Sequence, residues 1–227
     1  MKQLTHENNF IYLCLSLIVL LFSGAVIQEF PDTFGGSVFS IITLLMLLAS
    51  IKSLHTDMPW RRTVYVLIVL ILLLEIISKV LVIEYSRYLN LLILLIFFIH
   101  SFVVGSKQIL FQGKADLNII IGSLSLYLLL GLIWSIFYLF LLEIDPSALS
   151  NIVATNWQER FSTVTYYSFV TLTTLGYGDI LPTNTLSQFF ATMESIVGVF
   201  YMAIIVASLI NTHELKQDKK PTPMDKK

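Results

Sequence analysis

Long apolar runs separated by short polar stretches occupy most of the chain between residues 10 and 210. Six of them approach the roughly 20 residues that a helix needs to cross a hydrocarbon core about 30 Å thick. They cover residues 10–27, 34–51, 63–83, 88–104, 118–142 and 186–210. A seventh run, residues 161–172, is too short to span and is typical of a re-entrant helix. The pattern predicts an all-α integral membrane protein with six transmembrane helices and one re-entrant helix.

The first run has a competing interpretation as a cleaved signal peptide. Lys2, the apolar stretch after it and the small residues Ser23, Gly24 and Ala25 loosely fit such a leader. Glu7 weakens the positive start, and the apolar run is long for a leader. We therefore expect this run to be retained as the first span.

The composition agrees with a membrane protein and argues against other classes. Of the 227 residues, 56% are hydrophobic and 13% are charged, whereas a soluble domain is about a quarter charged. A net charge of −1 indicates no nucleic-acid partner. Cys14 is the only cysteine, which excludes a disulfide framework within one chain. The sequence contains no nucleophile–base spacing, P-loop or cluster of metal ligands, so we expect neither enzymatic activity nor a cofactor.

Lysine and arginine are distributed unevenly between the two sides that these spans define. If the N-terminus is cytoplasmic, Arg87 and Arg160 fall outside and Lys79 lies within a span, while 11 of the 14 basic residues fall inside. Cytoplasmic loops are enriched in lysine and arginine. The bias predicts a multi-pass protein of the cell membrane with both termini in the cytoplasm. The inner set is Lys2, Lys52, Arg61, Arg62, Lys107, Lys114, Lys216, Lys219, Lys220, Lys226 and Lys227.

A glycine-containing segment follows the predicted re-entrant helix. Residues 171–179 read TLTTLGYGD. A dehydrated cation needs a cage of oxygen atoms, and backbone carbonyls supply one only if successive peptides turn them to the same side. That arrangement requires positive φ at some residues, which Gly176 and Gly178 accept at little cost. Thr174 adds a hydroxyl. One chain supplies one wall of such a cage, so the segment implies four chains around an axis.

This segment resembles the potassium-channel signature, whose usual form is threonine, valine, glycine, tyrosine, glycine. Here Leu175 stands where valine is usual, although its carbonyl rather than its side chain would coordinate the ion. The resemblance extends over residues 118–210 and includes Pro182. It implies a homotetramer that binds K⁺ as the permeant ion, not as a cofactor, at a selectivity filter made of Thr174, Leu175, Gly176, Tyr177 and Gly178. It also implies filter support from Thr173, Asp179, Glu194 and the aromatic pair Tyr166 and Tyr167, where many members carry tryptophans.

The resemblance divides the chain into four parts. Residues 1–104 form a four-helix domain similar to a voltage sensor, 105–117 a cytoplasmic linker, 118–210 the pore domain and 211–227 a short cytoplasmic tail. The pore domain comprises an outer helix at 118–142, a pore helix at 161–172, a filter at 173–179 and an inner helix at 186–210. Voltage-gated potassium channels carry a ladder of arginines in the fourth span. Residues 88–104 contain no lysine or arginine, so we expect no strong voltage gating.

Four other residues are candidates for gating or for structure. Glu75 and Lys79 are four apart, which favours an ion pair on one helical face. The pair holds helices together, acts as a remnant sensor or proton-linked gate, or lies at the membrane interface. Glu194 is either a hydrogen-bonded strut to the short helix or a direct influence on filter conduction. Gly198 lies where the family often has a hinge glycine in the inner helix.

Two alternatives to a potassium-selective channel stay open at this point. One is a less selective cation channel, which the presence of Tyr177 and Gly178 disfavours. The other is a membrane scaffold or regulatory subunit that assembles with other channels and conducts little by itself. Membrane lipid is an expected partner in every case.

Overall fold

Helices make up nearly all of the described structure. The computed structural model describes residues 9–26, 32–53, 58–81, 86–110, 117–152 and 157–217. In this part of the chain the only pairing between extended segments is an isolated antiparallel bridge between Leu149 and Pro182. The seven helices found there are α1 (Asn9–Val26), α2 (Asp32–Ser53), α3 (Met58–Leu81), α4 (Ser86–Leu110), α5 (Leu117–Ile144), α6 (Trp157–Leu172) and α7 (Thr185–Gln217). The predicted all-α class is confirmed.

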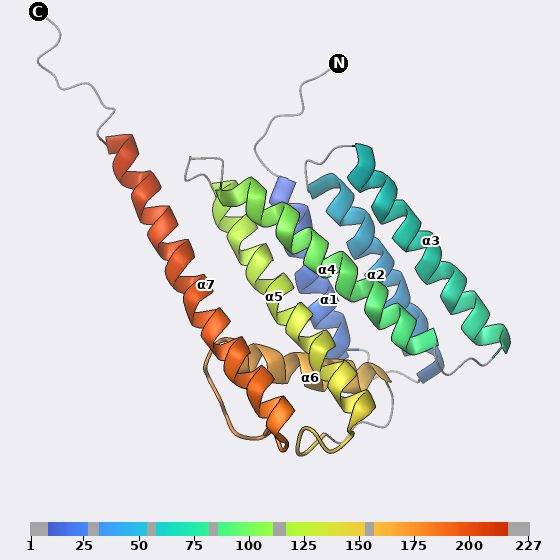
Figure 1. Ribbon diagram of the computed structural model, residues 1–227. Coiled ribbons are helices and arrows are strands. Elements are labelled where there is room, and N and C mark those ends of the chain that lie inside the picture. Colours follow the sequence, from blue (N-terminus) through green and yellow to red (C-terminus); the bar gives the residue numbers. More distant parts are fainter. Residues whose placement is uncertain are drawn as a thin grey trace, which may run out of the picture.

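Helices α1 to α4 form a bundle beside α5, and α6 lies across one end of α5 and α7 (Figure 1). In this arrangement α1 contacts α2, α5 and α6, while α4 contacts α3 and α5. The start of α1 and the end of α7 lie at the opposite end of the molecule from α6 (Figure 1). The bundle therefore packs against α5 and against α6, the helix that leads into segment 173–179.

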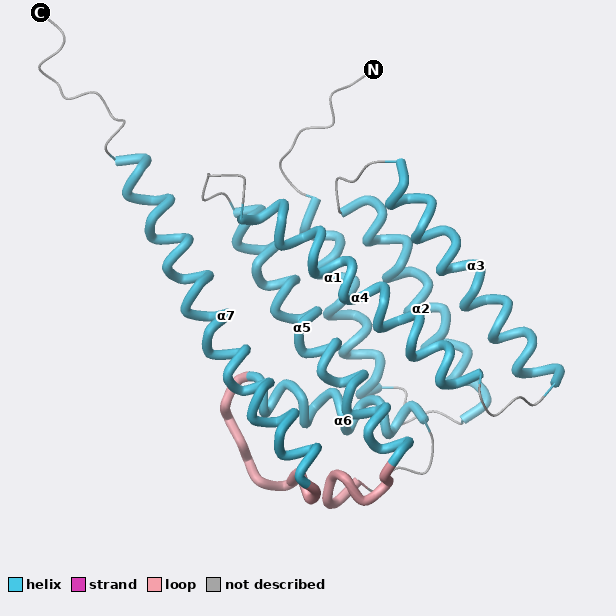
Figure 2. The backbone as a smooth tube through the Cα atoms, viewed as in Figure 1, coloured by secondary structure: helices cyan, strands magenta, loops and turns pink. Residues whose placement is uncertain are grey.

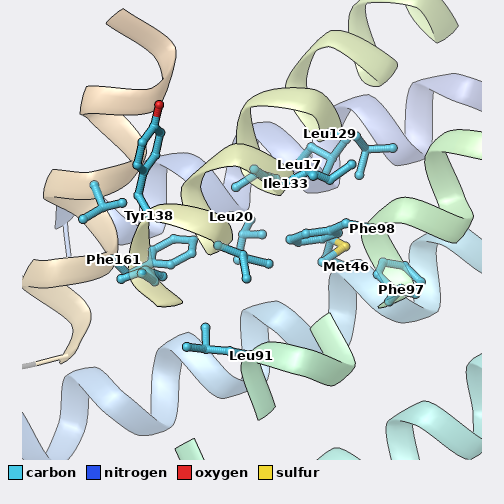
Figure 3. Packing of buried hydrophobic residues seen from close by; sticks show 14 of the residues in the cluster. Leu17, Leu20, Met46, Leu91, Phe97, Phe98, Leu129, Ile133, Tyr138 and Phe161 are labelled. Atoms are coloured by element: carbon cyan, nitrogen blue, oxygen red, sulfur yellow. The ribbon is translucent and has the colours of Figure 1, made fainter. Parts of the chain in front are cut away.

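Buried apolar side chains from α1, α2, α4 and α5 meet in one cluster, part of which is drawn in Figure 3. Among lipid chains, transfer from water contributes little to helix association, and close packing holds the helices together. One atomic contact is worth only about 0.1–0.2 kcal/mol, but a buried leucine makes about 40–60 of them. The cluster thus fixes the bundle on α5. Its members with no more than 2% exposure include Leu17, Leu20, Met46, Phe97, Phe98 and Leu129.

Two helices, α4 and α7, continue by more than a turn past the C-terminal ends of the apolar runs that predicted them. α7 continues to Gln217, so residues 211–217 belong to the helix and not to the predicted tail. No proline or glycine lies between Ile210 and Pro221, and Glu214, Leu215, Lys216 and Gln217 have high helix propensity. α4 continues to Leu110, so residues 105–110 of the predicted linker are helical. Ile109 in this last stretch is buried, which gives the extra turn a packing partner.

The short helix α6 begins at Trp157, four residues before the predicted start at 161, and ends at Leu172 as predicted. Trp157 stacks on Phe161 with ring centroids 5.5 Å apart. This contact extends the helix by one turn toward its start. Gln158, Glu159 and Arg160 are polar, so the apolar run alone did not mark that turn.

Three helices are long and apolar enough to cross a membrane within the described residues. They are Tyr88–Ile109, Leu117–Ile144 and Thr185–Ala207. Shorter apolar helices cover Phe10–Gly24, Ile41–Ser50 and Arg62–Leu74. The complete set of six spans stays a prediction. Helix α3 contains Glu75 and Lys79, but their side chains lie outside the described residues, so their ion pair also stays a prediction.

Candidate functional site

The first turn of α6 is anchored to two other helices. Glu143, near the end of α5, forms an ion pair with Arg160 of α6 at 3.2 Å. The second carboxylate oxygen of Glu143 lies 3.4 Å from the hydroxyl of Tyr88 in α4. The Glu143 carboxylate therefore links side chains of α4, α5 and α6. The bundle and the short helix are joined at the end of the molecule that holds segment 173–179.

The last turn of α6 fixes the backbone of the residues that follow it. The nitrogen of Thr174 donates to the carbonyl of Thr171, and that of Leu175 to the carbonyl of Val170, both at 2.9 Å. This pair of bonds is the Schellman motif, which ends a helix with one residue in the left-handed conformation. Thr174 takes that position with φ of 58°. Glycine is usual there, and a β-branched residue is uncommon at positive φ.

Positive φ recurs at every second residue from Thr174 onward. Gly176 has φ of 56° and Gly178 has φ of 79°, as the sequence predicted for both glycines. The positive φ of Thr174 was not predicted from sequence. The signal for it is the position of Thr174 two residues past the end of α6, where a left-handed residue often ends a helix. Alternation of this kind lets successive carbonyls turn to one side, which an ordinary strand does not.

Besides its backbone carbonyls, segment 173–179 carries the hydroxyls of Thr173, Thr174 and Tyr177 and the Asp179 carboxylate. The Thr173 hydroxyl is bonded to the Phe169 carbonyl and the Asp179 carboxylate to Tyr166, so the carbonyls are the repeated oxygen ligands along the segment. Within the described residues, no group of three or more His, Cys, Asp or Glu side chains could hold a metal ion. All seven residues of segment 173–179 are exposed in the single chain. The segment is therefore suited to a cation that binds carbonyl oxygens.

The two tyrosines of α6 have different contacts. The Tyr166 hydroxyl donates to Oδ2 of Asp179 at 2.6 Å, so it braces the far end of segment 173–179. Tyr167 is buried and packs edge-on against Tyr138 of α5, with ring centroids 4.9 Å apart. The sequence predicted that both would brace the segment from behind. Neighbouring residues on a helix point about 100° apart, so one faces the segment and the other faces α5.

Asp179 is stabilised in its ionised form by Tyr166. The hydrogen bond from the Tyr166 hydroxyl is the main reason that the pKa of Asp179 lies below its ordinary value of 3.8. A carboxylate whose folded pKa is depressed stabilises the fold above its unfolded pKa. That contribution is lost as the pH falls through the folded pKa, which here lies on the acid side of 3.8.

We expect Tyr166→Phe to make the Asp179 end of the site more sensitive to acid. Without the hydroxyl donor, the pKa of Asp179 returns toward its ordinary range, so acid disrupts this end at a higher pH than in wild type. The measurement is the pH at which half of the ion flux is lost when the solution on the Asp179 side of the membrane is acidified. Tyr12→Phe, at an exposed position of α1, is the control. Equal midpoints for wild type and Tyr166→Phe would contradict the prediction.

Glu194 of α7 is fully buried between three helices. The Tyr138 hydroxyl of α5 donates to its Oε2 at 2.7 Å, and Oγ of Ser168 in α6 lies 2.5 Å from its Oε1. Figure 3 shows the Tyr138 hydroxyl directed away from the apolar cluster. The Ser168 hydroxyl also lies 2.8 Å from the Gly131 carbonyl oxygen. The predicted contact between Glu194 and the short helix is present, and it also includes α5.

We expect Glu194→Gln to be tolerated and Glu194→Ala to be strongly destabilising. Glutamine can accept from Tyr138 with its oxygen and donate to Ser168 with its nitrogen, which frees the Ser168 proton for Gly131. Alanine removes the Glu194 acceptor of the buried Tyr138 hydroxyl, at about 1–3 kcal/mol, and leaves a cavity where the glutamate side chain lay; Ser168 can still donate to Gly131. Thermal unfolding of the purified protein measures both variants. A glutamine variant as unstable as the alanine variant would show that this pairing is wrong.

Gly198 of α7 lies against the end of α6. A Cβ placed on Gly198 would collide with the carbonyl oxygen of Leu172. The Tyr127 hydroxyl of α5 lies 3.4 Å from the same oxygen. Helix α7 runs unbroken through Gly198, so the glycine permits a close approach between two helices. Its role as a hinge stays a prediction.

Helix α7 leaves a long apolar face uncovered in the single chain. α5 buries most of its apolar stretch, whereas α7 buries little of its own. In segment 173–179, Leu175 and Tyr177 are also exposed, at 54% and 66%. An apolar face of this extent packs against lipid or another protein chain. Its members on α7 include Phe189, Val199, Phe200, Met202, Ile204 and Val206.

Residues 124–214 match the model of a protein family described as "Ion channel". The match begins in α5, includes α6 and segment 173–179, and ends within α7; it covers less than half of the chain. No curated protein and no solved structure matches the chain. The match and the long apolar helices support passive ion conduction by a multi-pass membrane protein rather than catalysis.

Proposed function

We propose that the chain is the subunit of a homotetrameric potassium-selective channel that conducts K⁺ passively across the cell membrane. The observation that carries the proposal is the positive φ at Thr174, Gly176 and Gly178, in a segment held between the end of α6 and Asp179. This backbone suits a row of inward carbonyls, which replaces the hydration shell of a dehydrated cation.

In this proposal K⁺ binds to oxygen atoms of Thr174, Leu175, Gly176 and Tyr177. Thr173, Asp179, Tyr166 and Glu194 support the filter, and Gly178 completes it at the outer end. The C-terminal end of α6 carries partial negative charge, which favours a cation on the inner side of the filter. Replacement of valine by Leu175 leaves the carbonyl unchanged, so we expect it to leave selectivity unchanged.

The uncovered surface of the single chain supports a tetramer. One copy of segment 173–179 forms one wall of a pore, and irregular backbone at membrane depth needs protein or a water-filled path around it. The exposed apolar face of α7 and the exposed Leu175 and Tyr177 would meet neighbouring copies. Four copies around one axis complete the cage and cover these surfaces.

The charge distribution supports an orientation with both termini in the cytoplasm. The start of α1 and the end of α7 lie at the same end of the molecule (Figure 1), and the lysine and arginine bias assigns that end to the inner side. The filter then lies toward the outer side, next to α6.

Purified protein in liposomes tests the proposal and separates it from the alternative of a regulatory subunit. We expect size-exclusion chromatography to give a tetramer, and the liposomes to take up K⁺ without any other protein. Liposomes that take up no K⁺, although the tetramer is correctly inserted, would favour the regulatory subunit.

We expect open probability to depend only weakly on voltage. A charge that crosses the whole field gains about 2.3 kcal/mol per 100 mV, and steep gating needs several such charges in each subunit. The central part of α4 carries no lysine or arginine. Glu75 and Lys79 have opposite signs, so moving them together displaces almost no net charge. The measurement is a conductance–voltage curve in symmetric K⁺. A steep sigmoid equivalent to several gating charges would contradict this expectation.

A further inference from the structure

Two loops beside segment 173–179 are bonded to each other. Figure 2 shows them together at the end of the molecule that holds α6. The nitrogen of Ser150 donates to the Leu181 carbonyl at 2.8 Å, and the nitrogen of Thr183 donates to the Ala148 carbonyl at 3.0 Å. We call residues 145–152 the outer loop. These bonds fix the outer loop to residues 180–184, which connect segment 173–179 to α7.

The junction between the outer loop and α7 is closed by Asp145. Its Oδ2 accepts a hydrogen bond from Nδ2 of Asn184 at 2.7 Å. Asn184 also caps α7, because its Oδ1 accepts from the nitrogen of Ser187 at 2.8 Å. Hydrogen bonds from Ser147, and then from Asn184, hold the pKa of Asp145 below its usual range. The outer loop therefore has a fixed position relative to the start of α7.

Asn151 is the residue of the outer loop that reaches segment 173–179. Its Nδ2 donates to the backbone carbonyl oxygen of Asp179 at 2.8 Å. Asn151 has φ of 56°, a conformation that asparagine tolerates better than most residues. The positive φ and the side-chain amide together make this residue type suitable for the position.

Asp179 is consequently held from two sides. Its side chain accepts the hydrogen bond of Tyr166 from α6, and its backbone carbonyl accepts that of Asn151 from the outer loop. Gly178, directly before it, has φ of 79°. A glycine has little conformational preference of its own at such an angle. The fixed position of Asp179 therefore limits how the last peptides of the segment can rearrange.

We propose that Asn151 is a positioning residue for the outer end of the selectivity filter, and that the outer loop stabilises the conducting conformation through it. This inference rests on the proposed function of segment 173–179. Loss of the Asn151 amide would let Asp179 and the peptide before it rotate. The filter would then leave its conducting conformation more readily when K⁺ is scarce.

The test compares Asn151→Gly with Pro146→Gly in the full-length tetramer. Both variants put a glycine into the outer loop, and Pro146 is exposed in its first turn. Only Asn151→Gly removes the donor to Asp179, and glycine keeps the positive φ without strain. Asn151→Asp is the third variant, because aspartate accepts positive φ but its carboxylate cannot donate. The readout is the rate at which single channels in a bilayer stop conducting after outer K⁺ is replaced by Na⁺.

We expect Asn151→Gly and Asn151→Asp to stop conducting about twofold to tenfold faster than wild type, the factor that one ordinary hydrogen bond represents. High outer K⁺ should restore wild-type behaviour, and Pro146→Gly should match wild type throughout. An effect on folding alone would lower the number of channels and leave this rate unchanged. Equal rates for Asn151→Gly and wild type, or equal acceleration in Pro146→Gly, would overturn the inference. A wild-type protein that passes no K⁺ would instead overturn the proposed function, on which the inference rests.

Discussion

Gly176→Ala is expected to abolish potassium-selective current. Gly176 has φ of 56°, and within one chain no heavy atom lies within 4 Å of a Cβ placed there, so the expected effect comes from backbone conformation and not from a clash inside the subunit. The left-handed conformation costs a residue with a Cβ roughly 1–2 kcal/mol. Thr174 already carries such a cost two residues earlier, and in a tetramer the substitution occurs four times around the pore.

The measurement is single-channel recording of Gly176→Ala beside Gly24→Ala. A Cβ on Gly24 would meet Phe161 and Ser162 at ordinary contact distances of 3.7 Å and more. We therefore expect Gly24→Ala to conduct with wild-type selectivity. Unchanged selectivity in Gly176→Ala would show that positive φ at this residue is not needed for the filter.

Gly198→Ala is expected to destabilise the assembled protein and disturb the filter. The new Cβ would collide with the backbone oxygen of Leu172, and a backbone atom has no alternative rotamer to move into. Overpacking of this kind costs about 1–3 kcal/mol per site. Helices α6 and α7 must then move apart at Leu172, the last residue of α6, which lies within the Schellman motif.

A graded series of glycine replacements separates close packing from a hinge. A Cβ on Gly24 finds room, one on Gly122 would lie 3.0 Å from side-chain atoms of Phe10 and Ile109, and one on Gly198 meets backbone. We expect thermal stability to fall in that order. If Gly198 acted only as a hinge, Gly198→Ala would keep wild-type stability and merely open less often.

The helices could be predicted from sequence because their apolar runs are long. Hydropathy, however, shows where the apolar run ends, whereas the helix itself can continue through polar residues. Helix α7 continues to Gln217 for this reason. Helix α4 continues to Leu110 because Ile109 packs against the position of Gly122 in α5. A contact with another helix leaves no trace in the periodicity of a single run.

The glycines of the candidate filter could also be predicted, since a Cβ restricts positive φ. The conformation of Thr174 was missed because residue type gives no hint of it; the helix end before it imposes the angle. The outer loop was missed for a different reason. Asn151 and Asp179 are 28 residues apart, and their hydrogen bond depends on how both loops leave α5 and α6.

The most direct test of the central claim is the reversal potential of the purified channel with K⁺ on one side of a bilayer and Na⁺ on the other. If the carbonyl oxygens of Thr174, Leu175, Gly176 and Tyr177 form a potassium filter, the reversal potential lies far from zero. Its sign is the one expected when K⁺ crosses the bilayer and Na⁺ does not. A reversal potential near zero would contradict the account and indicate a weakly selective cation channel.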